Sequence, residues 1–119
     1  MESTSAPIPQ PAGPEELRAA LALLAPHALR TFDAERAAAL QQARDLVSAA
    51  PLRRFTGQWA VYVAIERHPE RADRLRRLEA RAAETDDLAE VRAITSEIGR
   101  ILDVAFVEAG IAREDHGTA

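Results

Sequence analysis

The stretch PLRRFTGQWAVYVAIERHPERADRLRRLEAR, residues 51–81, decides the fold because two helices of opposite character meet in it. Its first half is mostly apolar and holds the only Trp and the only Tyr of the chain. Its second half is strongly charged, and the whole stretch carries eight of the fifteen arginines. A helix that is apolar on most sides lies in the middle of a bundle or in an interface. We therefore expect the rest of the chain to cover the first of these two helices.

Proline positions and apolar spacing predict five helices. Pro14, Pro51 and Pro69 suit the first turn of a helix, and Pro69 also ends the helix before it. Asp87 and Glu90 have the spacing of a capping box at the start of the last helix. The predicted helices span residues 14–24, 26–47, 51–68, 69–83 and 87–108. The expected fold is all-α, a single compact bundle of four to five helices within residues 14–110.

Both ends of the chain lack a helical pattern. Residues 1–13 contain Pro7, Pro9 and Pro11, which block helix and favour an extended chain. We expect a disordered, Pro-rich N-terminal tail there. Residues 111–119 follow Gly110 and are expected to fray.

The sequence indicates no contact with a membrane. The longest apolar run, from Trp59 to Ile65, is much shorter than the roughly 20 residues that cross a bilayer. Residues 1–13 have neither the basic start nor the apolar centre of a secretory signal. The absence of cysteine is compatible with a reducing compartment. A cytoplasmic location is the expectation.

An apolar stripe on the last predicted helix has two interpretations. Its members follow alternating steps of three and four residues: Leu88, Val91, Thr95, Ile98, Leu102 and Ala105. Such a stripe packs the helix within its own bundle or pairs it with a second chain. The stripe lasts under three heptads and places Thr and Ala at seam positions, which favours packing within the bundle. Self-association as a homodimer is the alternative.

The net charge of −4 is unevenly distributed along the chain. Residues 53–81 carry eight arginines against four acids, and the other segments are acidic. A basic segment of this kind can bind nucleic acid, so the Arg-rich helix over residues 69–83 gives the alternative functional hypothesis. Its acids alternate with the arginines and neutralise them locally, which argues against a continuous phosphate-binding track.

No pattern in the sequence indicates an enzyme, a metal site or a cofactor. His27, His68 and His116 form no spaced pair with each other or with a carboxylate, and are interpreted as solvated. Glu35 and Glu66 are the acids in the most apolar surroundings, but a single carboxylate without a partner is not a catalytic site. A Gly-rich phosphate loop and a nucleophile motif are both missing. We expect a protein without enzymatic activity, cofactor or metal.

Part of the chain resembles a known family. The likeness lies in Pro14-Glu15-Glu16-Leu17, Phe32-x-x-Glu35-Arg36, Ala39-Leu40-x-x-Ala43, and Pro51-Leu52-Arg53 followed by Trp59. Over roughly residues 14–69 this pattern is similar to that of a family of short actinobacterial helical proteins, a domain of unknown function. The resemblance implies two amphipathic helices followed by a Trp-containing helix, and it implies no activity.

Protein–protein contact is the leading functional hypothesis. A helix too apolar for a small monomer to hide, edged by arginines, is typical of an interface. The candidate interaction residues are Trp59, Tyr62, Arg67, Arg74 and Arg77, because Trp, Tyr and Arg most often dominate interfaces. For Trp59 and Tyr62 the other interpretation is plain core packing, which we favour slightly. The sequence thus predicts a cytoplasmic interaction or regulatory protein that binds a protein partner or a second copy of itself.

Overall fold

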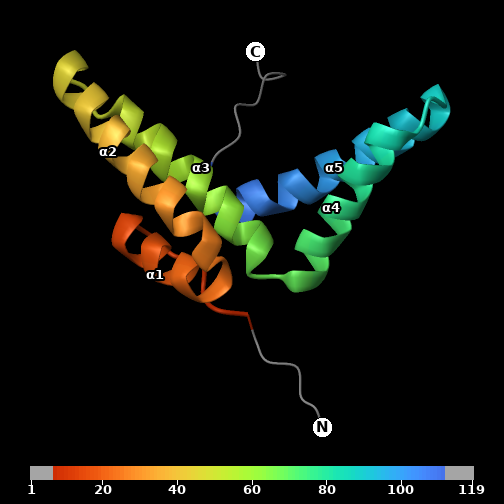
Figure 1. The fold of residues 1–119 in the computed structure, drawn as a ribbon, viewed down its shortest axis with the longest axis horizontal. Helices are drawn as coiled ribbons and strands as arrows, with labels where there is room; N and C mark the ends of the chain where they lie inside the picture. Colours follow the sequence, from red (N-terminus) through yellow and green to blue (C-terminus); the bar gives the residue numbers. More distant parts are fainter. Residues whose placement is uncertain (1–6, 112–119) are drawn as a thin grey trace, which may run out of the picture.

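The computed structural model describes residues 7–111, which fold into five α-helices and one 3-10 turn (Figure 1). In chain order these are α1 (Pro14–Leu24), η1 (Pro26–Ala28), α2 (Leu29–Leu46), α3 (Ala50–Glu66), α4 (Pro69–Glu84) and α5 (Leu88–Glu108). No strand occurs in this part of the chain, so the predicted all-α fold is confirmed.

Most helices begin where the prolines predict. Pro14, Pro51 and Pro69 each lie in the first turn of a helix, because the fixed φ of proline suits that position and its missing N–H costs nothing there. Pro26 opens the 3-10 turn instead, and α2 begins only at Leu29. The predicted helix over residues 26–47 is therefore two consecutive elements.

The capping box predicted at the start of α5 is only half correct. Asp87 caps the helix, since its Oδ1 accepts a hydrogen bond from the Ala89 backbone N at 2.9 Å. Glu90 does not return to the Asp87 N–H, which donates to Thr85 Oγ1 at 3.1 Å. The Glu90 carboxylate accepts instead from Arg81 Nε at 2.6 Å and Nη2 at 3.0 Å. A charge-assisted, two-point bond of this kind is stronger than the bond to a neutral backbone N–H.

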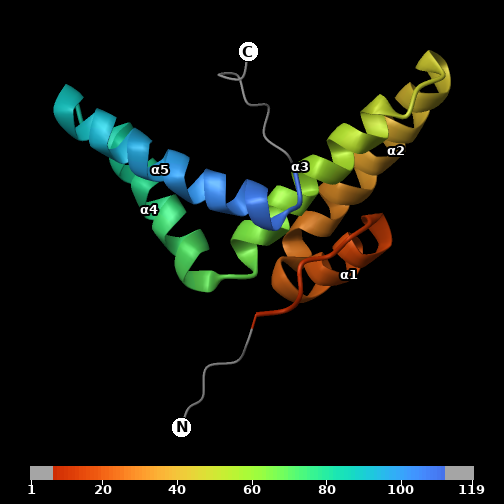
Figure 2. The same cartoon turned by 180° about the vertical axis from the view of Figure 1, so that it is seen from behind.

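The helices form a bundle that opens into two arms, as Figures 1 and 2 show from opposite sides. The central helix is α3, which contacts all four of the other α-helices. In the α2–α3 arm, α2 runs beside α3 and α1 lies across the base; in the α4–α5 arm, the last two helices pair. The radius of gyration is 16.5 Å, compared with about 13 Å for a globular domain of this length. The excess reflects the outward direction of the two arms.

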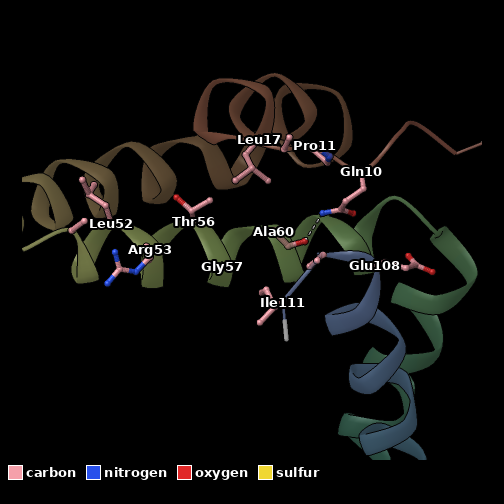
Figure 3. Close-up of a pocket in the computed structure, with 14 residues that line it drawn as sticks. Gln10, Pro11, Leu17, Leu52, Arg53, Thr56, Gly57, Ala60, Glu108 and Ile111 are labelled. Atoms are coloured by element: carbon pink, nitrogen blue, oxygen red, sulfur yellow. Dashed lines mark hydrogen bonds between the residues drawn. The ribbon is translucent and has the colours of Figure 1, made fainter. Parts of the chain in front are cut away.

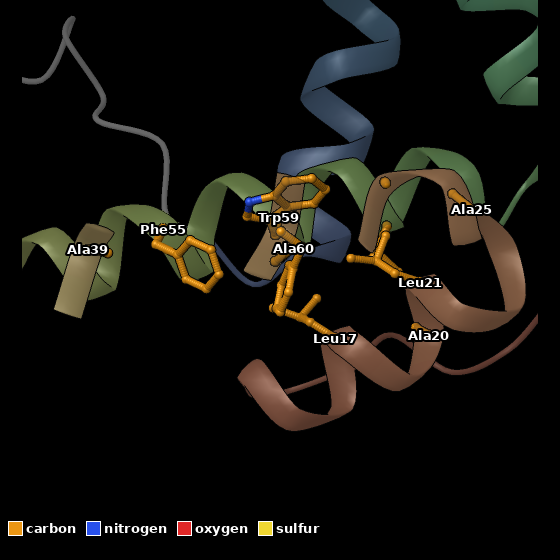
Figure 4. Packing of buried hydrophobic residues seen from close by; sticks show 11 residues of the cluster. Leu17, Ala20, Leu21, Ala25, Ala39, Phe55, Trp59 and Ala60 are labelled. Carbon is orange, nitrogen blue, oxygen red and sulfur yellow. The ribbon is translucent and has the colours of Figure 1, made fainter. Parts of the chain in front are cut away.

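The main core lies between α1, α2 and α3 (Figure 4). Phe32 is fully buried, with its ring centroid 5.0 Å from Phe55 and 5.3 Å from Trp59. The Trp59 ring meets Phe32 edge-on, which is a favourable arrangement of two aromatic quadrupoles. Leu17 and Leu21 of α1 close this core and are also fully buried. The short α1 is stable because it docks here, since an isolated helix of its length would be marginal.

A smaller core joins the α4–α5 arm to α3. It consists of Ala64, Ile65, Ala72 and Ala105, with half-buried residues such as Leu75 and Leu102 around it. Further along the arm, Ile94 is buried, while Leu88 is 69% exposed. The stripe predicted on the last helix therefore packs against α4 near the base and is only partly covered toward the tip.

The N-terminal segment is more ordered than predicted. Residues 7–13 contain no helix, as expected, but Ile8 packs against the main core and its carbonyl accepts a hydrogen bond from Arg67 Nη1 at 2.8 Å. Gln10 Nε2 donates to the Ala60 carbonyl at 3.0 Å. The prediction of a disordered tail is therefore wrong for residues 7–13, because these polar contacts fix the extended segment. Residues 1–6 and 112–119, which include His116 and most of the predicted frayed end, lie outside the described residues.

Candidate interaction surface

The two aromatic candidates for interaction lie in the core. Trp59 is only 6% exposed, and its indole Nε1 donates a hydrogen bond to Glu35 Oε1 at 2.9 Å. Tyr62 is half-buried, with its ring centroid 5.2 Å from that of Trp59. Of the two interpretations that the sequence leaves open, core packing describes both side chains. Trp59 has almost no surface left for a partner in this arrangement.

The arginines of α4 are all bound to carboxylates. The pairs are Arg71 with Glu108, Arg74 with Glu97, Arg76 with Glu66, Arg77 with Asp73, and Arg81 with Glu90. Three of these acids belong to α5, so the charges of α4 hold the α4–α5 arm together. The candidates Arg74 and Arg77 are therefore exposed residues of ion pairs, and the structure does not bring them beside Trp59 or Tyr62.

The remaining candidate, Arg67, belongs to a charged cluster at the base of the two arms. Glu108 Oε1 lies 2.9 Å from both Arg67 Nη2 and Arg71 Nη1, and 3.3 Å from His68 Nε2. Arg71 Nη1 also donates to the Ala64 carbonyl at 2.8 Å. The hydrogen bond and the charge of Arg71, with the nearby Arg67 and His68, lower the pKa of Glu108 from 4.5 to about 2. The cluster ties α3, α4 and α5 to the N-terminal segment, and the prediction of a solvated His68 is wrong.

A long apolar groove follows the uncovered face of α3. Figure 3 shows its inner end, where Leu17 and Pro11 lie on one side of α3 and Ile111 lies on the other. This hollow has a volume of about 720 Å³ and reaches Leu52 and Ala49 at the start of α3. A second hollow shares Ala49 and Leu52 and continues to Leu40, Ala43 and Val47 of α2. We call the two together the α3 groove.

Small residues keep the floor of the α3 groove open. Thr56, Gly57 and Ala60 lie on one face of the helix, and a side chain added at Gly57 would meet Ile111 Cδ1 at 3.4 Å. The neighbour of Gly57 is thus Ile111, which lies three residues beyond the end of α5.

The outer end of the groove exposes large apolar side chains. Of the lining residues, Val47 is 91% exposed and Leu40 is just over one-third exposed. Leu46 does not line the groove but lies next to Val47 in the chain, and it is 66% exposed. The spacing of apolar residues places Leu40 and either Leu46 or Val47 on the core face of the predicted helix over residues 26–47. They stay uncovered because α1 has 11 residues against 18 in α2, and its ion pairs reach only Asp33 and Arg36.

Val47 also has an unusual backbone. It ends α2 in the left-handed region with φ 50° and ψ 53°, a conformation that suits glycine and is unfavourable for a β-branched residue. Strained residues of this kind concentrate at functional positions. An exposed Val in a position where glycine is usual marks the turn between α2 and α3 as a candidate contact.

The charges beside the groove are positive. Arg44 and Arg53 line it, and within residues 7–111 the guanidinium of Arg53 has no hydrogen bond or ion pair. Glu108 is the only acid among the lining residues, and it is already bound by Arg67 and Arg71. The groove therefore offers an apolar surface with an unpaired cation at its edge.

Glu35 and Glu66, the acids in the most apolar surroundings of the sequence, each have a partner in the fold. Glu35 is bound to the Trp59 indole and Glu66 to Arg76, at 2.9 and 3.2 Å. His27 is exposed. Between residues 7 and 111, no three His, Asp or Glu side chains are grouped to hold a metal ion. None of the helices described there has both the length and the apolar character to cross a membrane.

Comparisons with protein-family models, with curated proteins and with solved structures find no match to this chain. The resemblance to an actinobacterial family over residues 14–69 therefore stays a prediction. The site has to be interpreted from its own geometry.

The α3 groove was not predicted from the sequence because its lining residues lie far apart in the chain. Leu46 or Val47 fits the apolar spacing of a core helix, and only the length of α1 decides that both stay exposed. One signal was present: α2 ends at Val47 and Ser48 without a glycine, which is an unfavourable helix end.

Proposed function

We propose that this protein acts by protein–protein contact, and that the α3 groove is the contact surface. The observation that carries the proposal is the uncovered apolar strip from Val47 to Ile111. It combines exposed large side chains at one end with a hollow of ligand size at the other. Contiguous apolar surface of this kind marks interaction sites in proteins that are otherwise well packed.

The shape of the groove suits a helix or an extended segment of a partner. Its floor is a helix face with small residues, which lets another backbone approach closely. Its edge carries Arg53, and arginine is enriched in the contacts that dominate interfaces. The protein is proposed to be a cytoplasmic interaction or regulatory protein that binds a protein partner or a second copy.

Nucleic-acid binding through the Arg-rich helix is the weaker proposal. Every arginine of α4 already has a carboxylate partner, so a phosphate would have to displace Glu66, Asp73, Glu90, Glu97 or Glu108. No observation favours that exchange over the existing ion pairs.

Co-purification with a groove variant tests the proposal. The tagged protein is isolated from the lysate of its own host after nuclease treatment, and its molar mass is measured by light scattering. The variant is Leu46→Gln with Val47→Asn. It should fold normally, because both side chains are exposed and asparagine tolerates the left-handed conformation of residue 47.

The control is Leu23→Gln, which removes a leucine that is 75% exposed but lies on α1, outside the groove. We expect a stoichiometric protein partner or a homodimer with the wild type and with Leu23→Gln, and its loss with the groove variant. Partners that vanish with nuclease, partners that the groove variant retains, or a monomer without any partner would overturn the proposal.

A further inference from the structure

The tips of the two arms carry opposite charge. Around the turn between α2 and α3, residues 41–54 contain Arg44, Arg53 and Arg54 against a single acid, Asp45. Around the turn between α4 and α5, residues 79–92 contain five acids against two arginines, Arg81 and Arg92. We call these segments the basic tip and the acidic tip; their net charges are +2 and −3.

Much of this charge has no partner within the described residues. Arg53 and Arg54 are exposed and form no ion pair there, and the same holds for Glu79 and Asp86 on the acidic tip. Glu84 lies 4.0 Å from Arg81, which already binds Glu90 through two hydrogen bonds. Each tip therefore keeps unpaired charge of one sign.

Each tip also exposes large apolar side chains. The basic tip has Leu46 and Val47, and the acidic tip has Leu88, all of them about two-thirds exposed or more. The two tips of one molecule cannot meet each other, because the arms diverge from the base (Figure 1). A complementary surface for each tip is nevertheless present on every other copy of the chain.

We propose that the occupant of the α3 groove is a second copy of this chain, with the basic tip of each copy against the acidic tip of the other. A two-fold axis forms this contact twice, since a surface that contacts its complement on the partner does so reciprocally. Leu88 and the residues beside it then cover Val47 at the outer end of the groove, together with its chain neighbour Leu46. This inference rests on the proposed function, and it names the partner.

The apolar contacts and the charges have separate roles in this assembly. A stable interface takes about 800 Å² from each partner, roughly a tenth of the 7928 Å² surface of this chain. Burial of the apolar groove and of the exposed leucines supplies affinity. Complementary charge speeds encounter and selects which arms meet, because like charges brought together are strongly unfavourable.

A charge exchange between two variants tests the contact. The first variant, Arg53→Glu with Arg54→Glu, makes both tips acidic. The second variant, Glu84→Arg with Asp86→Arg, makes both tips basic. The new acids lie near the start of α3 and the new arginine at residue 84 ends α4, which the helix dipoles favour. The N-cap Asp87 and the bound Glu90 stay unchanged, so both variants should fold.

Molar mass is measured for each protein alone and for their equimolar mixture. The wild type should be a dimer whose dissociation constant rises with salt, because surface charges are screened. Each variant alone should dissociate at least about tenfold more readily, since its arms repel. The mixture should form a heterodimer, in which both contacts again join opposite charges. Arg30→Glu, at the start of α2 and away from both tips, should dimerise as the wild type does.

Three outcomes would overturn this inference. A dimer whose strength is the same in all the variants would show that the tips do not meet, and so would two variants that fail to associate when mixed. A monomeric wild type would exclude the second copy altogether. If that monomer still captured a protein partner, and lost it in the Leu46→Gln, Val47→Asn variant, the proposed function would stand while this inference failed.

Discussion

The α2–α3 arm and the α4–α5 arm are helical hairpins of similar length that are stabilised in different ways. The first is covered by α1 and packs three aromatic rings against one another. The second has a core of mostly small side chains and is joined across its helices by Arg74–Glu97 and Arg81–Glu90. Apolar burial contributes about 25 cal/mol per Å², whereas exposed ion pairs contribute about 0–1 kcal/mol each. The α4–α5 arm should therefore open more readily than the α2–α3 arm.

Removing the central aromatic ring should have the largest effect. Trp59→Ala deletes the contacts with Phe32 and Tyr62 and leaves the Glu35 carboxylate without its indole donor. We expect the free energy of unfolding to fall by about 3–5 kcal/mol. Leu75→Ala in the other arm removes a half-buried side chain and should cost less. Denaturant titration followed by circular dichroism measures both, and equal losses would contradict the contrast between the arms.

Breaking the charged cluster at the base should have the next largest effect. Glu108→Gln leaves Arg67 and Arg71 half-buried without a carboxylate, and should cost about 2 kcal/mol. Because the fold lowers the pKa of Glu108 to about 2, its ionised form stabilises the wild type above pH 4.5. That contribution is lost as the pH falls from 4.5 toward 2.

The pH dependence provides the check on this second prediction. Unfolding of the wild type and of Glu108→Gln is compared at pH 7, 4.5 and 3. The difference in stability between them should shrink as the pH is lowered. A difference that stays constant down to pH 3 would mean that Glu108 does not hold the two arms together through its charge.

A glycine at the turn of the basic tip should stabilise the protein. Val47→Gly relieves the left-handed conformation, which costs a residue with a side chain about 1–2 kcal/mol. The greater freedom of glycine in the unfolded chain offsets part of that gain, so we expect a net increase of up to about 1 kcal/mol. If Val47 is retained for contact, the more stable variant should also associate more weakly. If the association of the variant is unchanged, the left-handed conformation of Val47 has no role in binding.

Removing an exposed ion pair should have the smallest effect. Arg74 and Glu97 join the middle of α4 to α5, and the Arg74 side chain is more than half exposed. Arg74→Ala should cost less than about 1 kcal/mol, and raising the salt concentration should reduce that cost further. A thermal unfolding series at low and high salt measures it. A loss as large as that of Leu75→Ala would mean that ion pairs, and not apolar contacts, stabilise the α4–α5 arm.

The sequence predicts the helices of both arms well, for local reasons. Pro14, Pro51 and Pro69 fix three helix starts, and Asp87 caps a fourth. These signals act within one turn of the helix, so no tertiary information is needed. Trp59 in the core follows similarly from the apolar surroundings of residues 59–65.

The surface depends on contacts that no local pattern contains. Whether Leu46 and Val47 are covered depends on how far α1 extends along α2, and the docking of Ile8 depends on Arg67, which is 59 residues away. The ion pairs from α4 to Glu66, Glu97 and Glu108 likewise depend on how three helices are arranged. Charge counts along the chain identified the arginines and could not identify their partners.

The fluorescence of the single tryptophan reports on only one of the two arms. Trp59 lies among the rings of the α2–α3 arm, and the α4–α5 arm contains no indole at all. Its emission therefore monitors one arm, whereas far-ultraviolet ellipticity records the helices of both. If the arms melt as one cooperative unit, the two signals will change together. If the α4–α5 arm melts first, ellipticity will be lost while the emission spectrum still has its native shape.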